Sequence, residues 1–161
     1  MVWDIRGEIL RASQQVGAAI LELQSEAAEG IRTEVIKRST DDYIPQSLIW
    51  NHLRDYSFVI CNDPHSWLVV SNFIKNTKVL MLFNDVDDKT VFEFTDGADI
   101  VPTLQECFGF EYYLTNYELD YLICFNHHDV LIAAGTACSW LTELTNDKGE
   151  LIEPFSSDIV K

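Results

Sequence analysis

Apolar side chains near the start of the chain recur with the spacing of one helical face. Steps of three or four residues place side chains on one side of an α-helix, and they separate Ile5, Ile9, Ala12, Val16, Ile20 and Leu23. This spacing predicts a helix that continues to Leu23. Ser25 is a suitable N-cap for a second helix, which the same spacing extends to Val35. Gly30 is unfavourable inside a helix and speaks against one continuous helix.

The centre of the chain holds short apolar runs with the length of buried strands. The strands predicted from these runs span 57–61, 79–83, 90–94, 110–115, 120–125 and 130–134. Helices are predicted around them, and these span 45–54, 65–75, 99–108 and 137–144. A strand is the alternative for the second of these helices, because Leu68, Val69 and Val70 are apolar and largely β-branched.

The order of these elements predicts an α+β fold. The strands cluster in the centre and do not alternate regularly with helices, which favours a mixed, largely antiparallel sheet over a parallel one. We therefore expect a single globular domain over 1–161, with a sheet of about six strands and the N-terminal helices packed on one side. Residues 1–54 form its helical part, and 145–161 form a polar tail.

The charge of the chain narrows the partners that it can have. Its 161 residues include 26 acidic and 11 basic ones, for a net charge of −15, and 47% are hydrophobic. A disordered chain is excluded by that hydrophobic content, and no apolar run reaches the ~18 residues of a membrane helix. A nucleic-acid partner is not expected, because the chain would repel phosphates. Neither a membrane nor a nucleic acid is therefore a predicted partner.

The negative charge is concentrated after the helical N-terminal part. Residues 1–54 carry a net charge of −2, whereas 55–161 carry −13. Solubility alone is one explanation, and a basic protein partner, attracted by complementary potential, is the other. The acidic residues predicted to make this contact lie in turns around the hairpin of 79–83 and 90–94, and they are Asp85, Asp87, Asp88, Asp96 and Asp99.

The cysteines and the absence of known motifs argue against several kinds of site. Each cysteine lies in an apolar stretch and none forms a C-x-x-C pair, which predicts free, buried thiols in a reducing cytoplasm; they are Cys61, Cys107, Cys124 and Cys138. The N-terminus has no signal-peptide pattern. No nucleophile motif, glycine-rich phosphate loop or metal-ligand spacing occurs. We therefore predict no cofactor, no metal and no motif-defined catalytic residue.

The most distinctive stretch is a polar turn between two strongly apolar strands. It consists of Asn126, His127, His128 and Asp129. Asn and Asp commonly form such turns for structural reasons alone, because their side chains bond to nearby backbone. The alternative is a ligand or partner contact made by the two imidazoles, since histidine can act as an acid or a base near neutral pH.

The last third of the chain resembles small, acidic, soluble bacterial proteins without assigned function. The resemblance is carried by 106–113, 120–129, Gly135, Trp140 and Leu141. It implies an α+β fold and supplies no activity or catalytic residue. By acidity and size alone, the chain is also similar, more loosely, to immunity proteins that neutralise cationic toxins.

Three functions therefore stay open at this point. The first is an acidic protein-binding protein, such as an immunity protein that docks a cationic toxin through the aspartates named above. The second is an enzyme for a small molecule that uses the turn at 126–129. The third is a structural or regulatory module that self-associates through its N-terminal helices, since the sequence leaves the oligomeric state undetermined.

Overall fold

A seven-stranded sheet runs through the middle of the molecule, and each neighbouring pair of strands is antiparallel. The computed structural model describes residues 4–54 and 57–152. The spatial order of the strands is β1-β4-β3-β5-β6-β7-β2. Along the chain they are β1 (Ile20–Glu22), β2 (Phe58–Cys61), β3 (Val79–Leu82), β4 (Phe92–Phe94), β5 (Tyr112–Thr115), β6 (Tyr121–Phe125) and β7 (Leu131–Gly135).

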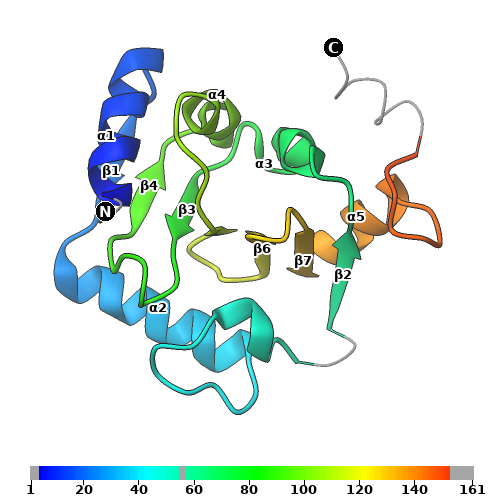
Figure 1. Ribbon diagram of the computed structural model, residues 1–161. Helices are drawn as coiled ribbons and strands as arrows, with labels where there is room; N and C mark the ends of the chain where they lie inside the picture. Colours follow the sequence, from blue (N-terminus) through cyan, green and yellow to red (C-terminus); the bar gives the residue numbers. More distant parts are fainter. Residues whose placement is uncertain (1–3, 55–56, 153–161) are drawn as a thin grey trace.

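Helices cover both faces of this sheet (Figure 1). The α-helices are α1 (Ile5–Val16), α2 (Ser25–Ser39), α3 (Ser71–Ile74), α4 (Ile100–Gln105) and α5 (Ala137–Leu144). Three short 3-10 helices complete the described elements, and they are η1 (Ile49–His52), η2 (Ser66–Val70) and η3 (Gly97–Asp99). No helix within the described ranges combines the length and the apolarity that crossing a bilayer requires.

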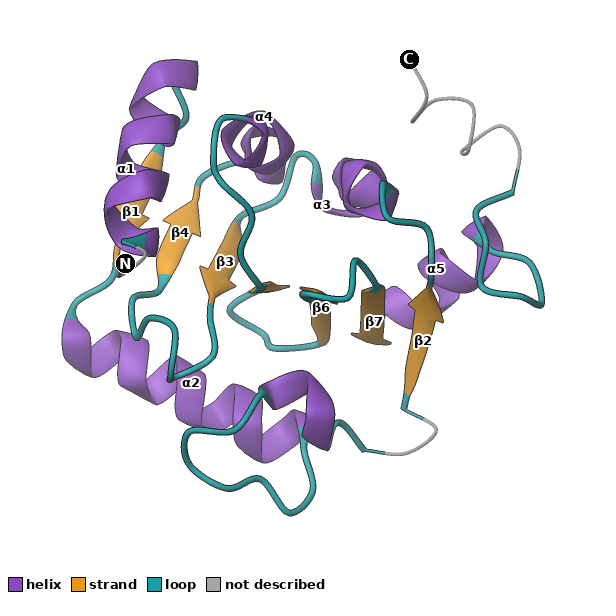
Figure 2. Cartoon of the chain, in the orientation of Figure 1, coloured by secondary structure: helices purple, strands orange, loops and turns teal. Residues whose placement is uncertain are grey.

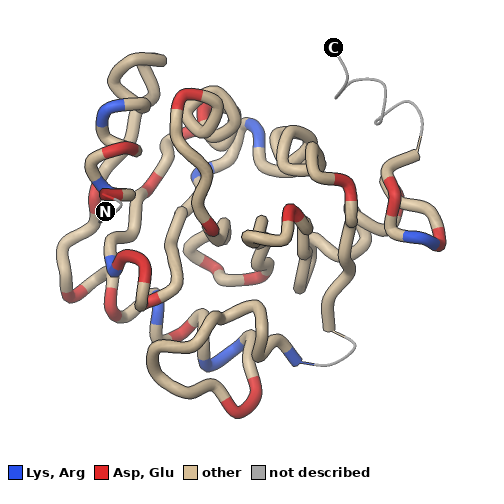
Figure 3. The backbone as a smooth tube through the Cα atoms, in the orientation of Figure 1, with Lys and Arg blue, Asp and Glu red and all other residues tan. Residues whose placement is uncertain are grey.

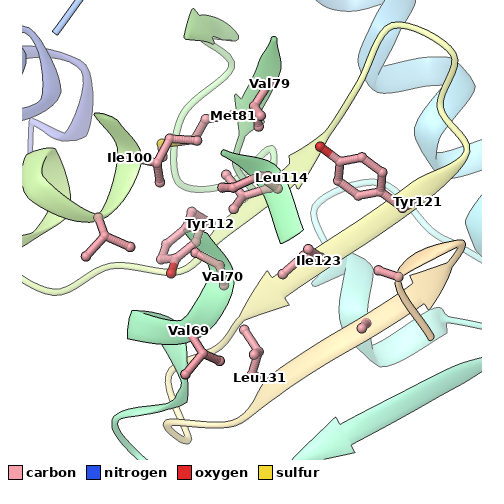
Figure 4. Packing of buried hydrophobic residues seen from close by; sticks show 14 of the residues in the cluster. Val69, Val70, Val79, Met81, Ile100, Tyr112, Leu114, Tyr121, Ile123 and Leu131 are labelled. Atoms are coloured by element: carbon pink, nitrogen blue, oxygen red, sulfur yellow. The ribbon is translucent and has the colours of Figure 1, made fainter. Parts of the chain in front are cut away.

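Successive residues of each central strand point to opposite faces, so the sheet builds two cores. Val79 and Met81 of β3 face the core that α1, α4 and α5 cover, whereas Leu80 and Leu82 face the one that α2 and η1 cover. Figure 2 shows α2 on one side of the sheet, opposite α1, α3 and α4. Figure 4 shows the first core, where side chains of the sheet meet those of η2 and α4.

The α+β class and the antiparallel sheet are therefore confirmed, with two differences. The sheet has seven strands rather than about six, and α1 and α2 pack on opposite faces rather than on one side. Both differences follow from Gly17, which adopts a left-handed conformation (φ 75°) and ends α1. The residues that the periodicity assigned to a longer helix instead form β1, which pairs with β4.

After α2, the predicted elements lie at the observed positions, but several differ from the observed elements in length. Each of the six predicted strands overlaps an observed one, and 137–144 is α5. The predicted helix 45–54 shrinks to η1, and the predicted helix 65–75 is divided between η2 and α3. In the described part of the predicted tail, Thr145 and Leu151 form a β-bridge and Leu151 is buried. The remainder of that tail, 153–161, lies outside the described residues.

Two glycines give a matched test of this backbone. Gly135 ends β7 with φ 67°, and an added Cβ would lie 2.3 Å from the carbonyl oxygen of Asp120. Gly30 lies within α2, and its added Cβ would meet no neighbouring atom within 4 Å. We expect Gly135→Ala to lower the free energy of unfolding by at least about 1–3 kcal/mol, and Gly30→Ala to raise it by roughly 0.5–1 kcal/mol. Urea unfolding followed by circular dichroism measures both, and an unchanged stability of Gly135→Ala would contradict the close approach.

Candidate functional site

Antiparallel pairing brings Glu111 and His127 together at one end of the sheet. Tyr112, the first residue of β5, is paired with Phe125, the last residue of β6. Glu111 comes directly before Tyr112, and His127 comes two positions after Phe125. The side chains of Glu111 and His127 therefore lie beside each other. The backbone N–H of His127 donates a 2.7 Å hydrogen bond to Oε2 of Glu111.

The Glu111 carboxylate is buried and surrounded by hydrogen-bond donors. Its side chain is 6% exposed. Oε1 accepts a 2.7 Å hydrogen bond from Nδ2 of Asn84, and Nε1 of Trp50 lies 3.2 and 3.1 Å from the two carboxylate oxygens. Oε2 also lies 2.5 Å from Nδ1 of His127. Each of these neighbouring groups can donate a hydrogen bond, and an ionised carboxylate can only accept one.

The neighbouring groups fix the direction of these hydrogen bonds. Oδ1 of Asn84 accepts from the backbone N–H of Ile49 at 2.9 Å and from the Tyr113 hydroxyl at 2.8 Å. A backbone N–H can only donate, so the amide oxygen of Asn84 must face Ile49 and its NH₂ group must face Glu111. The Tyr113 hydroxyl in turn accepts from the backbone N–H of Trp50 at 3.0 Å. Burial raises the pKa of Tyr113 well above its usual range, so the phenol keeps the proton that it donates.

This network determines which nitrogen of the neutral His127 ring carries the proton. Nδ1 faces an oxygen that can only accept, so the proton lies on Nδ1 and the lone pair on Nε2. The His127 side chain is 53% exposed, whereas its carboxylate partner is buried. In its neutral form, His127 therefore presents the lone pair of Nε2 at the surface, while the Glu111 carboxylate holds the other side of the ring.

The rest of the predicted turn has structural and aromatic contacts. Asn126 is buried, and its Oδ1 accepts from the backbone N–H groups of His128 and Val130 at 2.9 and 3.2 Å. The rings of His127 and His128 have centroids 4.0 Å apart, and Trp50 lies 5.9 and 5.7 Å from them. His128 and Asp129 are exposed. Asn126 thus holds the turn, and the imidazole of His128 forms no hydrogen bond with the described residues.

A cavity of about 440 Å³ opens beside this turn. Its polar walls include Glu111, His127 and Asp129, and its other walls come from η2, from the segment after α4 and from the ends of β5 and β6. Cys107 also lines it, but burial and the nearby Glu8 raise the pKa of its thiol to about 11. The thiol stays protonated near neutral pH and is a poor nucleophile.

The five aspartates predicted to contact a basic partner do not gather at one place. Asp85 forms an ion pair with Arg32, and Asp88 accepts a hydrogen bond from the backbone N–H of Thr90 in the turn after β3. The remaining aspartates also lie close to their own turns. Asp87 lies 3.3 Å from Nδ2 of Asn84, Asp96 caps η3, and Asp99 is the last residue of η3. Asp96 and Asp99 follow β4, at the opposite end of the hairpin from the turn that holds Asp85, Asp87 and Asp88. Figure 3 shows acidic segments distributed around the whole chain.

Sequence patterns pointed to His127 and missed the residues that orient it. Glu111 lies 16 positions before His127, and Asn84 lies 27 positions before Glu111. Trp50 comes from a third segment. The signal that could have exposed Glu111 is a single acidic residue between Phe110 and Tyr112, since a charge inside an apolar run must find partners when it is buried.

The comparisons with known proteins give a family and no activity. Residues 1–145 match the model of a family of unknown function, DUF6756, and the chain belongs to that family. No curated protein and no solved structure shows a significant match to it. The family agrees with the resemblance to proteins without assigned function, but neither a bacterial origin nor a role in immunity follows from it. Within the part of the chain that the structure describes, no three His, Cys, Asp or Glu side chains gather as a metal site.

The proton position on His127 can be tested without a substrate. We expect ¹⁵N–¹H NMR correlations of the imidazole rings to show the Nδ1–H tautomer for neutral His127. The Glu111→Gln variant should lose that preference, because its amide can donate as well as accept. His128 is the internal control, since Glu111 does not face its ring. Neutral His127 with its proton on Nε2 would contradict the hydrogen-bond directions derived above.

Proposed function

We propose that this chain is an enzyme that acts on a small molecule by general acid–base catalysis, with His127 as the base. The observation that carries the proposal is the contact of Nδ1 of His127 with the buried Glu111 carboxylate on the wall of a cavity. A general base needs a free lone pair, a fixed orientation and access to a bound molecule. The geometry around His127 supplies a physical basis for each of the three.

Glu111 would act as a positioning residue in this proposal. Its carboxylate holds the ring by the Nδ1 proton and stabilises the imidazolium that forms when Nε2 accepts a second proton. The carboxylate cannot rotate away, because Asn84 and the backbone of His127 occupy its oxygens. The orientation of the base is therefore built into the end of the sheet before any substrate binds.

The lining of the cavity favours direct proton transfer over covalent catalysis. Among its described lining residues there is no serine, threonine or lysine, and the one thiol, on Cys107, has a raised pKa. His127 would then remove a proton from bound water or from the substrate itself. Asp129, which lines the same cavity, is the second carboxylate in reach of a bound molecule.

Docking of a basic protein partner stays a separate proposal with weaker support. Its predicted contact residues include Asp85, which is paired with Arg32, and Asp96, which caps η3. Their positions at two ends of a hairpin do not form one contact surface. The cavity at His127 combines more of the features that a specific site needs, and we therefore favour the enzyme.

Hydrolysis of p-nitrophenyl acetate, a small neutral ester, tests the proposal. We expect the His127→Gln variant to lower the rate per mole of protein about 100-fold, within the range for loss of a general base. The Glu111→Gln variant should lower it less, and the pH at which the rate reaches half its maximum should move, because Glu111 acts through His127. Absorbance of released p-nitrophenolate measures the rates.

The neighbouring His128→Gln variant is the matched control, since it removes an exposed imidazole that Glu111 does not hold. Its rate should equal that of the unmodified protein, and circular dichroism should confirm that all three variants are folded. Equal rates for the two histidine variants, or no catalysed hydrolysis by the unmodified protein, would contradict the proposal.

A further inference from the structure

The cavity beside His127 is walled by aromatic rings. Three of them follow one another around it in edge-to-face contact: Phe108 and Phe110 have centroids 5.8 Å apart at 82°, and Phe110 and Tyr112 have centroids 6.4 Å apart at 76°. The ring of Phe125 lies 6.3 Å beyond Tyr112, and Trp67 of η2 adds a fifth ring. Four of the five are only partly buried, so a bound molecule could cover more of them.

The charged groups around this cavity have one sign. Glu111 and Asp129 line it, and Asp87 lines an adjoining hollow that shares Glu111 and His127. No lysine or arginine is among the described residues that line either space. A phosphate or carboxylate ligand would meet repulsion here with no cation to offset it.

The hydroxyl of Tyr112 adds a polar group that nothing in the described structure satisfies. The side chain lines the cavity and the residue is 3% exposed, yet the hydroxyl has no hydrogen-bond partner among the described residues. Burial raises the pKa of Tyr112 far above its usual range, so the hydroxyl stays protonated. Buried hydroxyls normally have partners, so Tyr112 is an exception in the wall of this cavity.

We infer that the cavity binds a small organic cation, with an alkylammonium group against the aromatic rings and near the Asp129 carboxylate. The face of an aromatic ring is electron-rich, and several rings around one space form the kind of site that recognises quaternary and protonated amines. A neutral apolar molecule would gain from the rings but not from the carboxylates. This inference rests on the proposed function, because it takes the cavity beside His127 as the substrate site.

A matched pair of probes separates the charge from the shape. Choline carries a trimethylammonium group, and 3,3-dimethylbutan-1-ol has the same shape with carbon in place of the nitrogen. In an NMR titration we expect choline to bind about tenfold more tightly than the neutral alcohol. Its shift changes should centre on the backbone signals of Trp67, Phe110 and Asp129.

Two substitutions test the parts of the site. Phe110→Leu keeps an apolar side chain but removes the ring, and it should weaken choline binding about fivefold while weakening the binding of the neutral alcohol less. Asp129→Asn removes the charge and keeps the left-handed turn (φ 59°), because asparagine tolerates that conformation; it should weaken choline about threefold, with no effect on the alcohol. Trp67→Leu replaces Phe110→Leu should the latter fail to fold.

The two proposals at this site fail separately. His127→Gln should lose ester hydrolysis and still bind choline more tightly than the neutral alcohol, because the rings and the Asp129 carboxylate that give this preference are unchanged. Equal affinities for choline and the alcohol, or equal losses of both in Phe110→Leu, would overturn the cation site. An unchanged rate of ester hydrolysis in His127→Gln would overturn the enzyme and leave the choline result standing.

Discussion

The burial of one carboxylate constrains the whole end of the molecule at which the site lies. An ionised group that is removed from water is tolerated only when hydrogen-bond donors replace the water. Glu111 obtains those donors from Trp50 after α2, Asn84 after β3 and His127 after β6. The three loops that carry these donors are distant in sequence, and each must therefore place its donor next to Glu111. Because an unpaired buried carboxylate costs free energy, the positions of the three loops depend on one another.

The same interaction explains why the loops on this side of the sheet are ordered without regular structure. The segment before β2 contains only η1, yet the backbone N–H groups of Ile49 and Trp50 are bonded to Asn84 and Tyr113. Tyr113 is fully buried in the core between the sheet and α2. The hydrogen bonds of the loops are thereby attached to the hydrophobic packing of the sheet. In the proposed enzyme, this attachment would hold the base in one orientation, which catalysis requires.

The parts of the fold that could be predicted are those encoded by local patterns. The range 137–144 and the hairpin around Asn126 depend on neighbouring residues, so periodicity and turn-forming side chains suffice for them. β1 could not be predicted, because its apolar residues continue the helical spacing and only Gly17 breaks it. The site was half predictable: His127 stands in an unusual turn, but its relation to Glu111 exists only through the pairing of β5 with β6. Strand pairing is a long-range property, and single-sequence patterns do not contain it.

The net negative charge of the chain also bears on which ligand this cavity binds. A net charge of −15 creates an attractive potential for any cation, and that attraction does not require the acids to form one patch. Scattered aspartates that cap turns and pair with arginine therefore still raise the local concentration of a small positive ligand, although they make a poor docking surface for a protein. The specific contacts then come from the aromatic rings and from Asp129, close to the cavity wall that holds His127. The long-range attraction and the local contacts both favour a small cation. Together they restrict the class of ligand more strongly than either one does alone.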